Sequence, residues 1–184
     1  DYTPLLEAGR HLYGGAWLAE RATAVSVALE EDRDDVDPVV RQILAGAGAM
    51  SAAQVWSSMH RVWELRREAD DILRSVDALL TPTVTKTYTV EQMRADPVEL
   101  NAQLGTYTTF TNLLDMCAIA VPAGSTAAHV PFGVTLHGPS GADQELAGLA
   151  SALADAVDQD SLMEVAVVGA HREGFGLHHQ STDR

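Results

Sequence analysis

The chain of 184 residues has little cysteine, little lysine and no long hydrophobic run. The single cysteine, Cys117, cannot form an internal disulfide bond, which fits a reducing cytosol and predicts a cytoplasmic protein. With Lys86 as the single lysine, 12 basic residues face 26 acidic ones, and the net charge is −14. Binding to nucleic acid or to an anionic membrane requires a basic surface, so we expect neither partner. No apolar run approaches the length of a membrane-spanning helix, and we expect no secretory leader.

Hydrophobic residues make up 46% of the chain, enough for a sizeable buried core. Residues 78–83, 118–122 and 132–136 are short apolar runs of strand length, and helical patterns lie between them. This alternation predicts an α/β fold in which helices are layered on a mixed sheet.

The starts of the helices are predicted by their capping residues. Ser51 and Thr89 each begin a capping box, and Asp37 and Asp96 each precede a proline that suits the first helical position. The longest predicted helix runs from Ser51 to about residue 76. Apolar residues recur along it at spacings of three and four, which predicts one buried stripe: Val55, Met59, Val62, Leu65, Ala69, Ile72 and Val76. Further helices are predicted over about 3–12, 16–29, 96–105 and 142–157, the last with Leu146, Leu149, Leu153 and Val157 facing inward.

Four stretches, in order, resemble one enzyme family. They are LEAGRHLYGGAWLAERATAV near the start, LLTPTVTKTYTVEQMRADP, then PVELNAQLGTYTTFTNLLDMCAIAVPAG with PFGVTL, and VAVVGAHREGFGLHHQ near the end. The chain resembles the amidase signature family and, within it, the allophanate hydrolases. Four ordered stretches are far more specific than one short motif.

The resemblance implies amide hydrolysis by a triad of two serines and a lysine, set in a glycine- and serine-rich segment. No such segment is present in this sequence. Ser57 and Ser58 lie inside the predicted long helix, and Lys86 follows Pro82 in a threonine-rich loop where the family's lysine does not fall. We therefore assign no catalytic residue to this chain and expect that it does not hydrolyse an amide alone.

Substrate recognition can be carried over from the resemblance. The family's segment with a tyrosine and an arginine that hold the substrate reads YGGAWLAER here, so the matching residues are Tyr13 and Arg21. A guanidinium can bind the carboxylate of allophanate through two parallel hydrogen bonds, and a tyrosine hydroxyl can bind its amide end. Gly14 and Ala16 replace an acidic residue and a proline of the family pattern. From the residues alone, Tyr13 could equally be an ordinary half-buried tyrosine, and Arg21 a surface ion-pair partner of Glu20 or of an acid in the next loop.

Other candidates have simpler interpretations. Cys117 has no neighbouring histidine and is interpreted as a small core residue. Asp115 is interpreted as a cap or a buried hydrogen-bonding group rather than a catalytic acid. The spacing of His171, His178 and His179 does not favour a metal site, and we expect no metal and no organic cofactor. The three tryptophans are interpreted as core or interface aromatics: Trp17, Trp56 and Trp63.

We therefore interpret residues 1–157 as the C-terminal half of an amidase domain. Residues 158–184 would be a linker and the first strand of a truncated C-terminal domain. The resemblance implies allophanate as the small-molecule substrate, with ammonia and carbon dioxide as products, and a functional link to a urea carboxylase. It also implies an N-terminal half of the same enzyme as partner, and a possible homodimer. The alternatives are an inactive remnant that serves in binding or assembly, and part of an amidase with another specificity.

Overall fold

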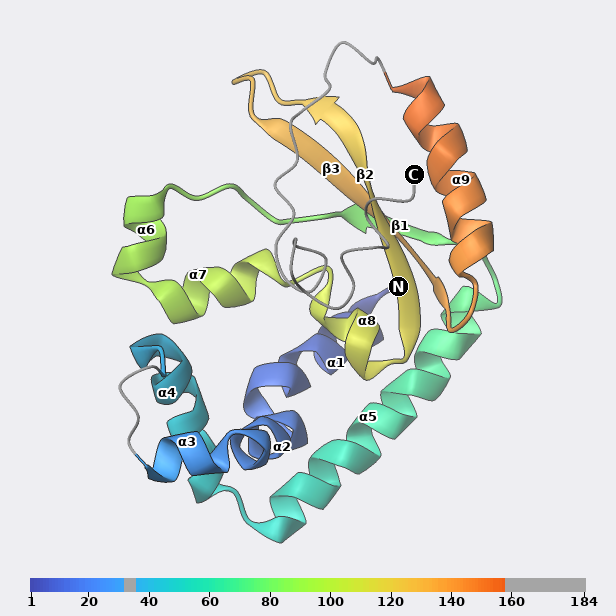
Figure 1. The fold of residues 1–184 in the computed structure, drawn as a ribbon. Helices are drawn as coiled ribbons and strands as arrows, with labels where there is room; N and C mark the ends of the chain where they lie inside the picture. The colour runs from blue at the N-terminus through green and yellow to red at the C-terminus, as the bar shows by residue number, and fades with distance from the viewer. Residues whose placement is uncertain (32–35, 158–184) are drawn as a thin grey trace, which may run out of the picture.

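The computed structural model of the protein describes residues 1–31 and 36–157 (Figure 1). Both helices and strands occur in this part of the chain, as the sequence predicts. The helices are α1 (Thr3–Gly14), α2 (Ala16–Ala24), α3 (Ser26–Glu30), α4 (Pro38–Ala45), the 3₁₀ turn η1 (Gly46–Ala49), α5 (Ala52–Leu73), α6 (Val90–Ala95), α7 (Pro97–Leu104), α8 (Thr109–Leu113) and α9 (Asp143–Ala156). The strands are β1 (Leu79–Pro82), β2 (Met116–Ser125) and β3 (Pro131–Pro139).

The three strands form one sheet in the order β1–β3–β2, and both pairings are antiparallel. Leu80, Leu136 and Ile119 lie opposite one another across the sheet, and in the next row His137 lies between Leu79 and Ala118. Because side chains alternate between the faces of a strand, the two rows belong to opposite faces. The predicted layering of helices on a sheet is confirmed, and the pairing among the described strands is antiparallel throughout.

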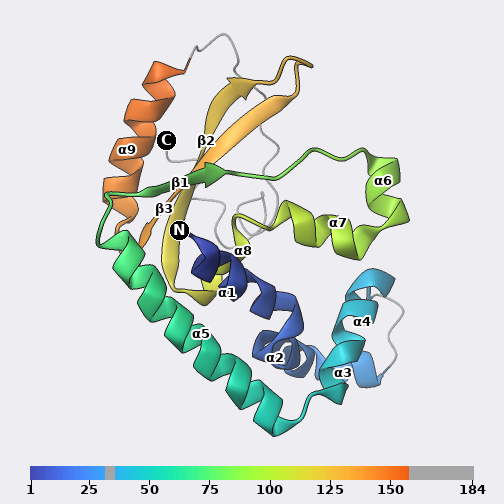
Figure 2. The same ribbon diagram turned by 180° about the vertical axis from the view of Figure 1, so that it is seen from behind.

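Helix α9 covers one face of the sheet (Figures 1 and 2). Val121 and Leu136 of the sheet pack there against Leu146 and Ala150 of the helix. The prediction that Leu146 faces inward is confirmed. The same prediction for Leu149 is wrong, since this residue is 41% exposed. The helix turns its 146–150–153 side toward the sheet, and this rotation places position 149 in solvent.

The opposite face of the sheet is covered by α1, α5 and α8, which share a second core. Leu5, Leu65 and Phe110 are fully buried there, one from each helix. Burial of a side chain of this size contributes about 1.5–3 kcal/mol. Leu79 and Met116 of the sheet pack against the same cluster. This core therefore fixes α1 relative to the sheet and positions the C-terminal end of α1.

The capping box that begins α5 is confirmed: Ser51 Oγ accepts from the Gln54 amide, and Gln54 Oε1 accepts from the Ser51 amide. The predicted stripe is buried at Val62, Leu65 and Ala69. The prediction that Val76 belongs to the buried stripe is wrong, because the helix ends at Leu73 and the valine is 47% exposed. The stripe faces α1 and α8, so α5 forms the outer support of the α1 core.

The single helix predicted over 16–29 is instead two helices, α2 and α3, with a break at Val25. Thr23 Oγ1 donates to the carbonyl of Ala19, a bond that bends helices, and β-branched residues alternate through this stretch. After the break, α4 and η1 pack back on α2 and form a third, small cluster of Leu18, Leu44 and Ala47.

The predicted linker and strand of residues 158–184, with His171, His178 and His179, lie outside the described residues. Among the helices of residues 1–31 and 36–157, none combines the length and apolarity that a bilayer crossing requires.

Candidate functional site

Tyr13 lies in the last turn of α1 and is half-buried. It lines a cavity of about 390 Å³ between α1, α7 and the turn that leads into α8. The other lining residues are Leu6, Gly9, Arg10, Ala102, Thr106 and Thr109. Gly9 is required for the close approach of the two segments, because a Cβ at this position would lie 2.5 Å from Thr109 Oγ1. The cavity thus joins two segments about 90 residues apart in the sequence.

Arg21 of α2 lies against Tyr13. Its guanidinium carbon is 5.1 Å from the centroid of the tyrosine ring, and its Nη2 donates to the carbonyl oxygen of Leu12 at 2.9 Å. A guanidinium over an aromatic face is attractive by about 0.5–1 kcal/mol. In the described part of the chain no carboxylate forms an ion pair with Arg21, so a surface ion pair is not what holds it. The structure therefore brings the two predicted residues together as a stacked pair. Arg21 itself is not among the residues that line the cavity.

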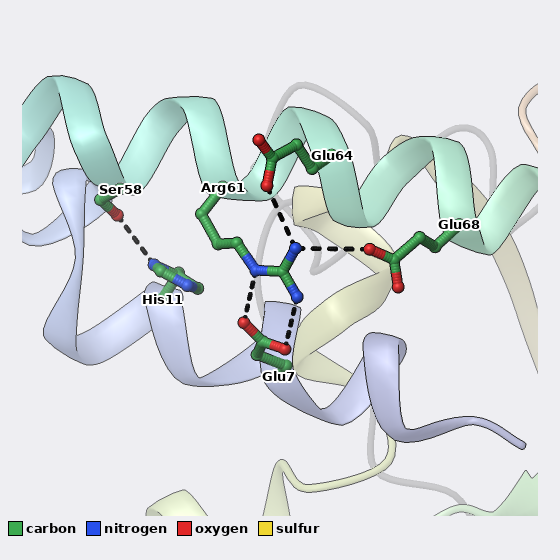
Figure 3. A network of polar contacts seen from close by, with 6 residues as sticks. All are labelled: Glu7, His11, Ser58, Arg61, Glu64 and Glu68. Atoms are coloured by element: carbon green, nitrogen blue, oxygen red, sulfur yellow. Dashed lines mark hydrogen bonds and ion pairs between the residues drawn. The ribbon is translucent and has the colours of Figure 1, made fainter.

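The turn between α1 and α2 is fixed by Ser58 of α5, a residue for which the sequence predicted a helical position and no role. Ser58 Oγ accepts from the Ala16 amide at 3.0 Å. It also lies 2.8 Å from Nδ1 of His11 (Figure 3). Because the hydroxyl accepts from Ala16, its own proton is available for His11 Nδ1. Burial lowers the pKa of His11, which favours the neutral ring that this bond requires. Ser58 is thus a cap for α2 supplied by another helix.

This serine and histidine do not form a nucleophile–base pair in the sense of a hydrolase. The serine is 9% exposed, and its hydroxyl already binds the first amide of α2. A signal for it was present in the sequence: position 58 falls on the apolar stripe of α5, between Val55 and Val62. A polar residue on a buried stripe predicts a buried hydrogen bond, but not its partner.

A second polar contact joins α1 to α5. Arg61 donates from Nε and Nη2 to the two carboxylate oxygens of Glu7, at 2.6 and 2.8 Å, and from Nη1 to Glu64 and Glu68 (Figure 3). These bonds hold the pKa of the Glu7 carboxyl below its usual range. The contact is partly solvated, so it contributes little to the stability of the protein. Its main effect is to orient α1 against α5.

His137 is a buried polar residue that the sequence patterns did not single out. It lies in β3, with Nε2 at 2.9 Å from Thr81 Oγ1 and Nδ1 at 3.1 Å from Thr111 Oγ1. Burial lowers its pKa to about 4, so the ring is neutral at pH 7. Thr111 also lines a second cavity of about 460 Å³, whose other lining residues are Leu12, Thr108, Thr109, Asn112, Met116 and Ala118. His137 therefore anchors one wall of that cavity to the sheet.

The remaining sequence candidates have structural roles. Cys117 is half-buried, packs against the α9 core and donates from Sγ to the Pro139 carbonyl at 3.0 Å. The expectation of a cap or buried bond at Asp115 is wrong: the residue has φ of 53° and forms an exposed ion pair with Arg66 at 2.6 Å. Its position at the tight turn from α8 to β2 leaves the carboxylate in solvent. Lys86 is exposed and lies over the ring of Tyr88.

The tryptophans divide between core and surface. Trp17 packs against the α1 core, whereas Trp56 and Trp63 are 55% and 47% exposed on α5. Their rings flank that of His60. Within residues 1–31 and 36–157, no three histidine, cysteine, aspartate or glutamate side chains gather in a way that could hold a metal ion.

Known proteins resemble this chain in sequence. The model of the Amidase family matches residues 19–147. Urea amidolyase from Saccharomyces cerevisiae is 34% identical over 98% of this chain and 11% of its own length. A subunit of glutamyl-tRNA(Gln) amidotransferase from a Synechococcus species is 36% identical, but that similarity covers 54% of this chain and 21% of the Synechococcus protein.

Solved structures resemble it in fold. An allophanate hydrolase variant from Kluyveromyces lactis has a TM-score of 0.78 and 32% identity, and the match covers 98% of this chain and 34% of that one. The urea amidolyase of the same yeast has a TM-score of 0.79 and 32% identity, over 98% of this chain and 13% of that one. The chain therefore spans about a tenth of the length of the urea amidolyases and about a third of the allophanate hydrolase.

Proposed function

Because the chain belongs to the amidase family, we propose that it is part of an amide hydrolase that acts on allophanate and releases ammonia and carbon dioxide. The observation that carries this proposal is the extent of the similarity: relatives named urea amidolyase and allophanate hydrolase align with 98% of the chain. The Synechococcus amidotransferase protein aligns with about half of it. Tyr13 lies before residue 19, where the Amidase match begins, and Arg21 lies just inside the match. The alignment with urea amidolyase is longer, covering 98% of the chain, and includes both residues.

In this proposal Tyr13 and Arg21 recognise the substrate. Allophanate carries a carboxylate at one end and a urea-like amide at the other. The guanidinium of Arg21 uses one amino group on the Leu12 carbonyl, and its other N–H groups are donors for a carboxylate. The stack on Tyr13 holds the ring in place, so the tyrosine hydroxyl meets the amide end without a large loss of side-chain entropy.

The bond-breaking groups would come from outside this sequence. Amide hydrolysis needs an activated nucleophile and donors aimed at the tetrahedral oxyanion. Ser58 is committed to the α1–α2 turn, and Lys86 is exposed over Tyr88, so neither suits that task. We propose that residues 1–157 form the C-terminal half of the amidase domain and that residues 158–184 begin a further domain. An N-terminal half of the same enzyme would supply the two serines and the lysine.

The partners follow from the same proposal. Allophanate is carboxylated urea, so an enzyme that carboxylates urea can supply it, and we propose a functional link to a urea carboxylase. A homodimer remains part of the proposal by resemblance. No metal ion or organic cofactor is invoked in this mechanism, because serine-based amide hydrolysis uses protein groups alone.

Replacing Arg21 by lysine tests the proposal. In the full-length enzyme, Arg21→Lys should raise KM for allophanate by roughly ten- to a hundredfold, with a smaller change in kcat, because an ammonium cannot stack on Tyr13 and bind a carboxylate through two parallel bonds. The measurement is the initial rate of ammonia release over a range of allophanate concentrations. Arg67→Lys, which changes an exposed arginine on α5, is the matched control and should leave KM unchanged. An unmodified enzyme that does not hydrolyse allophanate would refute the proposal.

A further inference from the structure

The cavity beside Tyr13 is lined by a positively charged side chain, Arg10, to which the resemblance assigned no role. Arg10 lies on α1 three residues before Tyr13, so the two share one side of the helix, and both line the cavity of about 390 Å³. None of the other lining residues is acidic: Leu6, Gly9, Ala102, Thr106 and Thr109. The lining therefore carries one positive charge and no negative charge, in a chain with a net charge of −14.

Arg10 forms no ion pair within the described part of the chain, and its guanidinium makes no hydrogen bond there. The carboxylate nearest to it in the sequence, Glu7, is held at both oxygens by Arg61. Both oxygens of this carboxylate are thus occupied by Arg61, and Glu7 acts on Arg10 only through space. The guanidinium keeps its donors for a ligand.

The rest of the cavity suits the neutral end of a small amide. Tyr13 offers a hydroxyl, and Thr106 and Thr109 add two more. Thr106 Oγ1 donates its proton to the Gln103 carbonyl at 2.8 Å, so its lone pairs are oriented to accept an N–H from a ligand. The volume lies near the lower end of the range for ligand sites, which fits a ligand of few atoms.

We propose that Arg10 binds the carboxylate of a small carboxylate-bearing amide in this cavity, with Tyr13 and Thr106 at the amide end. This inference rests on the proposed function, since it names a further residue that selects the same class of substrate. In this inference Arg10 acts beside Arg21: Arg10 lines the cavity, Arg21 lies over the Tyr13 ring, and both guanidinium groups are donors for the one carboxylate.

The test is binding of two stable probes that differ in charge and are close in shape. Malonamate has a carboxylate and an amide separated by one carbon, and malonamide replaces the carboxylate with a second amide. Titration of the ¹⁵N-labelled protein with malonamate should shift the amide signals of Thr106 and Thr109 and give a dissociation constant. Arg10→Gln should weaken malonamate binding by roughly ten- to a hundredfold, as expected for loss of a charge-assisted hydrogen bond. Binding of malonamide should not change.

Two further variants complete the test. Arg10→Lys should retain part of the malonamate affinity, because it keeps the charge and loses the fork. Arg94→Gln, which changes an exposed arginine on α6 that lines neither cavity, should behave like the unmodified protein. Arg10 is exposed and forms no ion pair in the described chain, so Arg10→Gln should unfold at an unchanged temperature, which is measured alongside.

The outcomes separate this inference from the proposed function. Malonamate affinity that is unchanged in Arg10→Gln, or no malonamate binding by the unmodified protein, overturns the role of Arg10. Allophanate hydrolysis by the full-length enzyme with the same KM in Arg10→Gln does so too, and leaves the proposed function standing. Conversely, if Arg10 governs malonamate binding but the enzyme does not hydrolyse allophanate, the carboxylate site stands and the proposed substrate is wrong.

Discussion

Replacing Gly15 by alanine is expected to lower the free energy of unfolding by about 3 kcal/mol, the upper part of the range for overpacking at a buried position. Gly15 is buried between α1 and α2, where a Cβ would overlap Ser58 Oγ and lie 2.8 Å from the carbonyl oxygen of His11. A side chain could rotate away, but the backbone of α1 cannot move without disturbing the core beneath it. The measurement is urea denaturation followed by circular dichroism.

The adjacent glycine provides the control. Gly14 is exposed, and a Cβ there would have no neighbour within 4 Å. Gly14→Ala should therefore be neutral or stabilise the protein by up to about 1 kcal/mol, since alanine favours the helix more than glycine does. Equal stabilities for the two alanine variants would contradict the close packing of the turn.

The Gly15 substitution should also disturb the candidate site, because it changes the turn between α1 and α2. Displacement of Ser58 Oγ would break its bonds to the Ala16 amide and to His11. These bonds fix the angle between α1, which carries Tyr13, and α2, which carries Arg21. The stack of Arg21 on Tyr13 depends on that angle. In Gly15→Ala the substrate contacts of the proposed function should therefore weaken together with the stability.

Local patterns predicted most of the elements of this fold. The capping boxes at Ser51 and Thr89 and the Asp–Pro pairs at residues 37–38 and 96–97 each begin a helix. A cap needs only residues two or three apart, so its energy is contained in the local sequence. Helix α1 begins without such a cap: Thr3 lies inside the helix, and Asp1 Oδ1 accepts from its amide.

The rotation of an element about its own axis was harder to predict. Leu149 satisfies the period of a helix as well as Ala150 does, but only the shape of the sheet decides which one is covered. The break at Val25 was missed for another reason: each residue from 16 to 29 tolerates a helix, and the residue types alone did not predict the bond from Thr23 Oγ1 to the Ala19 carbonyl that bends the chain there.

The candidate site shows the same division. Tyr13 and Arg21 were predicted by resemblance, but the contact between them was not, because it depends on the turn between α1 and α2. Arg10 lies in the same segment, but it was not predicted as a site residue, because the other wall of its cavity is formed by residues 102–109. The partners of Ser58 and His137 are equally remote, since His11 lies 47 positions from Ser58, and Thr81 lies 56 positions from His137. A buried polar residue can be suspected from a stripe, but a partner that distant comes only from the assembled fold.

Replacing the buried His137 by glutamine is expected to make the stability of the protein less dependent on pH. The pKa of His137 in the folded protein is about 4, below the 6.5 of an exposed histidine. Between these values the unfolded chain binds a proton that the folded protein does not bind, so stability falls as the pH decreases from about 6.5 to about 4. Between pH 7 and pH 4.5 this loss amounts to roughly 2 kcal/mol, at about 1.36 kcal/mol per pH unit.

His137→Gln should lack this loss, because a glutamine can still bond to Thr81 and Thr111 but does not titrate. The measurement is the free energy of unfolding in urea at pH 7 and at pH 4.5, for the variant and the unmodified protein. Other groups titrate in the same window, among them His11, whose pKa burial also lowers, and their effect cancels in the difference between the two proteins. His60→Gln, which changes an exposed histidine on α5, is the control and should retain the full pH dependence. If His137→Gln loses as much stability on acidification as the unmodified protein, then the ring is not kept neutral by burial, and the threonine pair does not require the uncharged form.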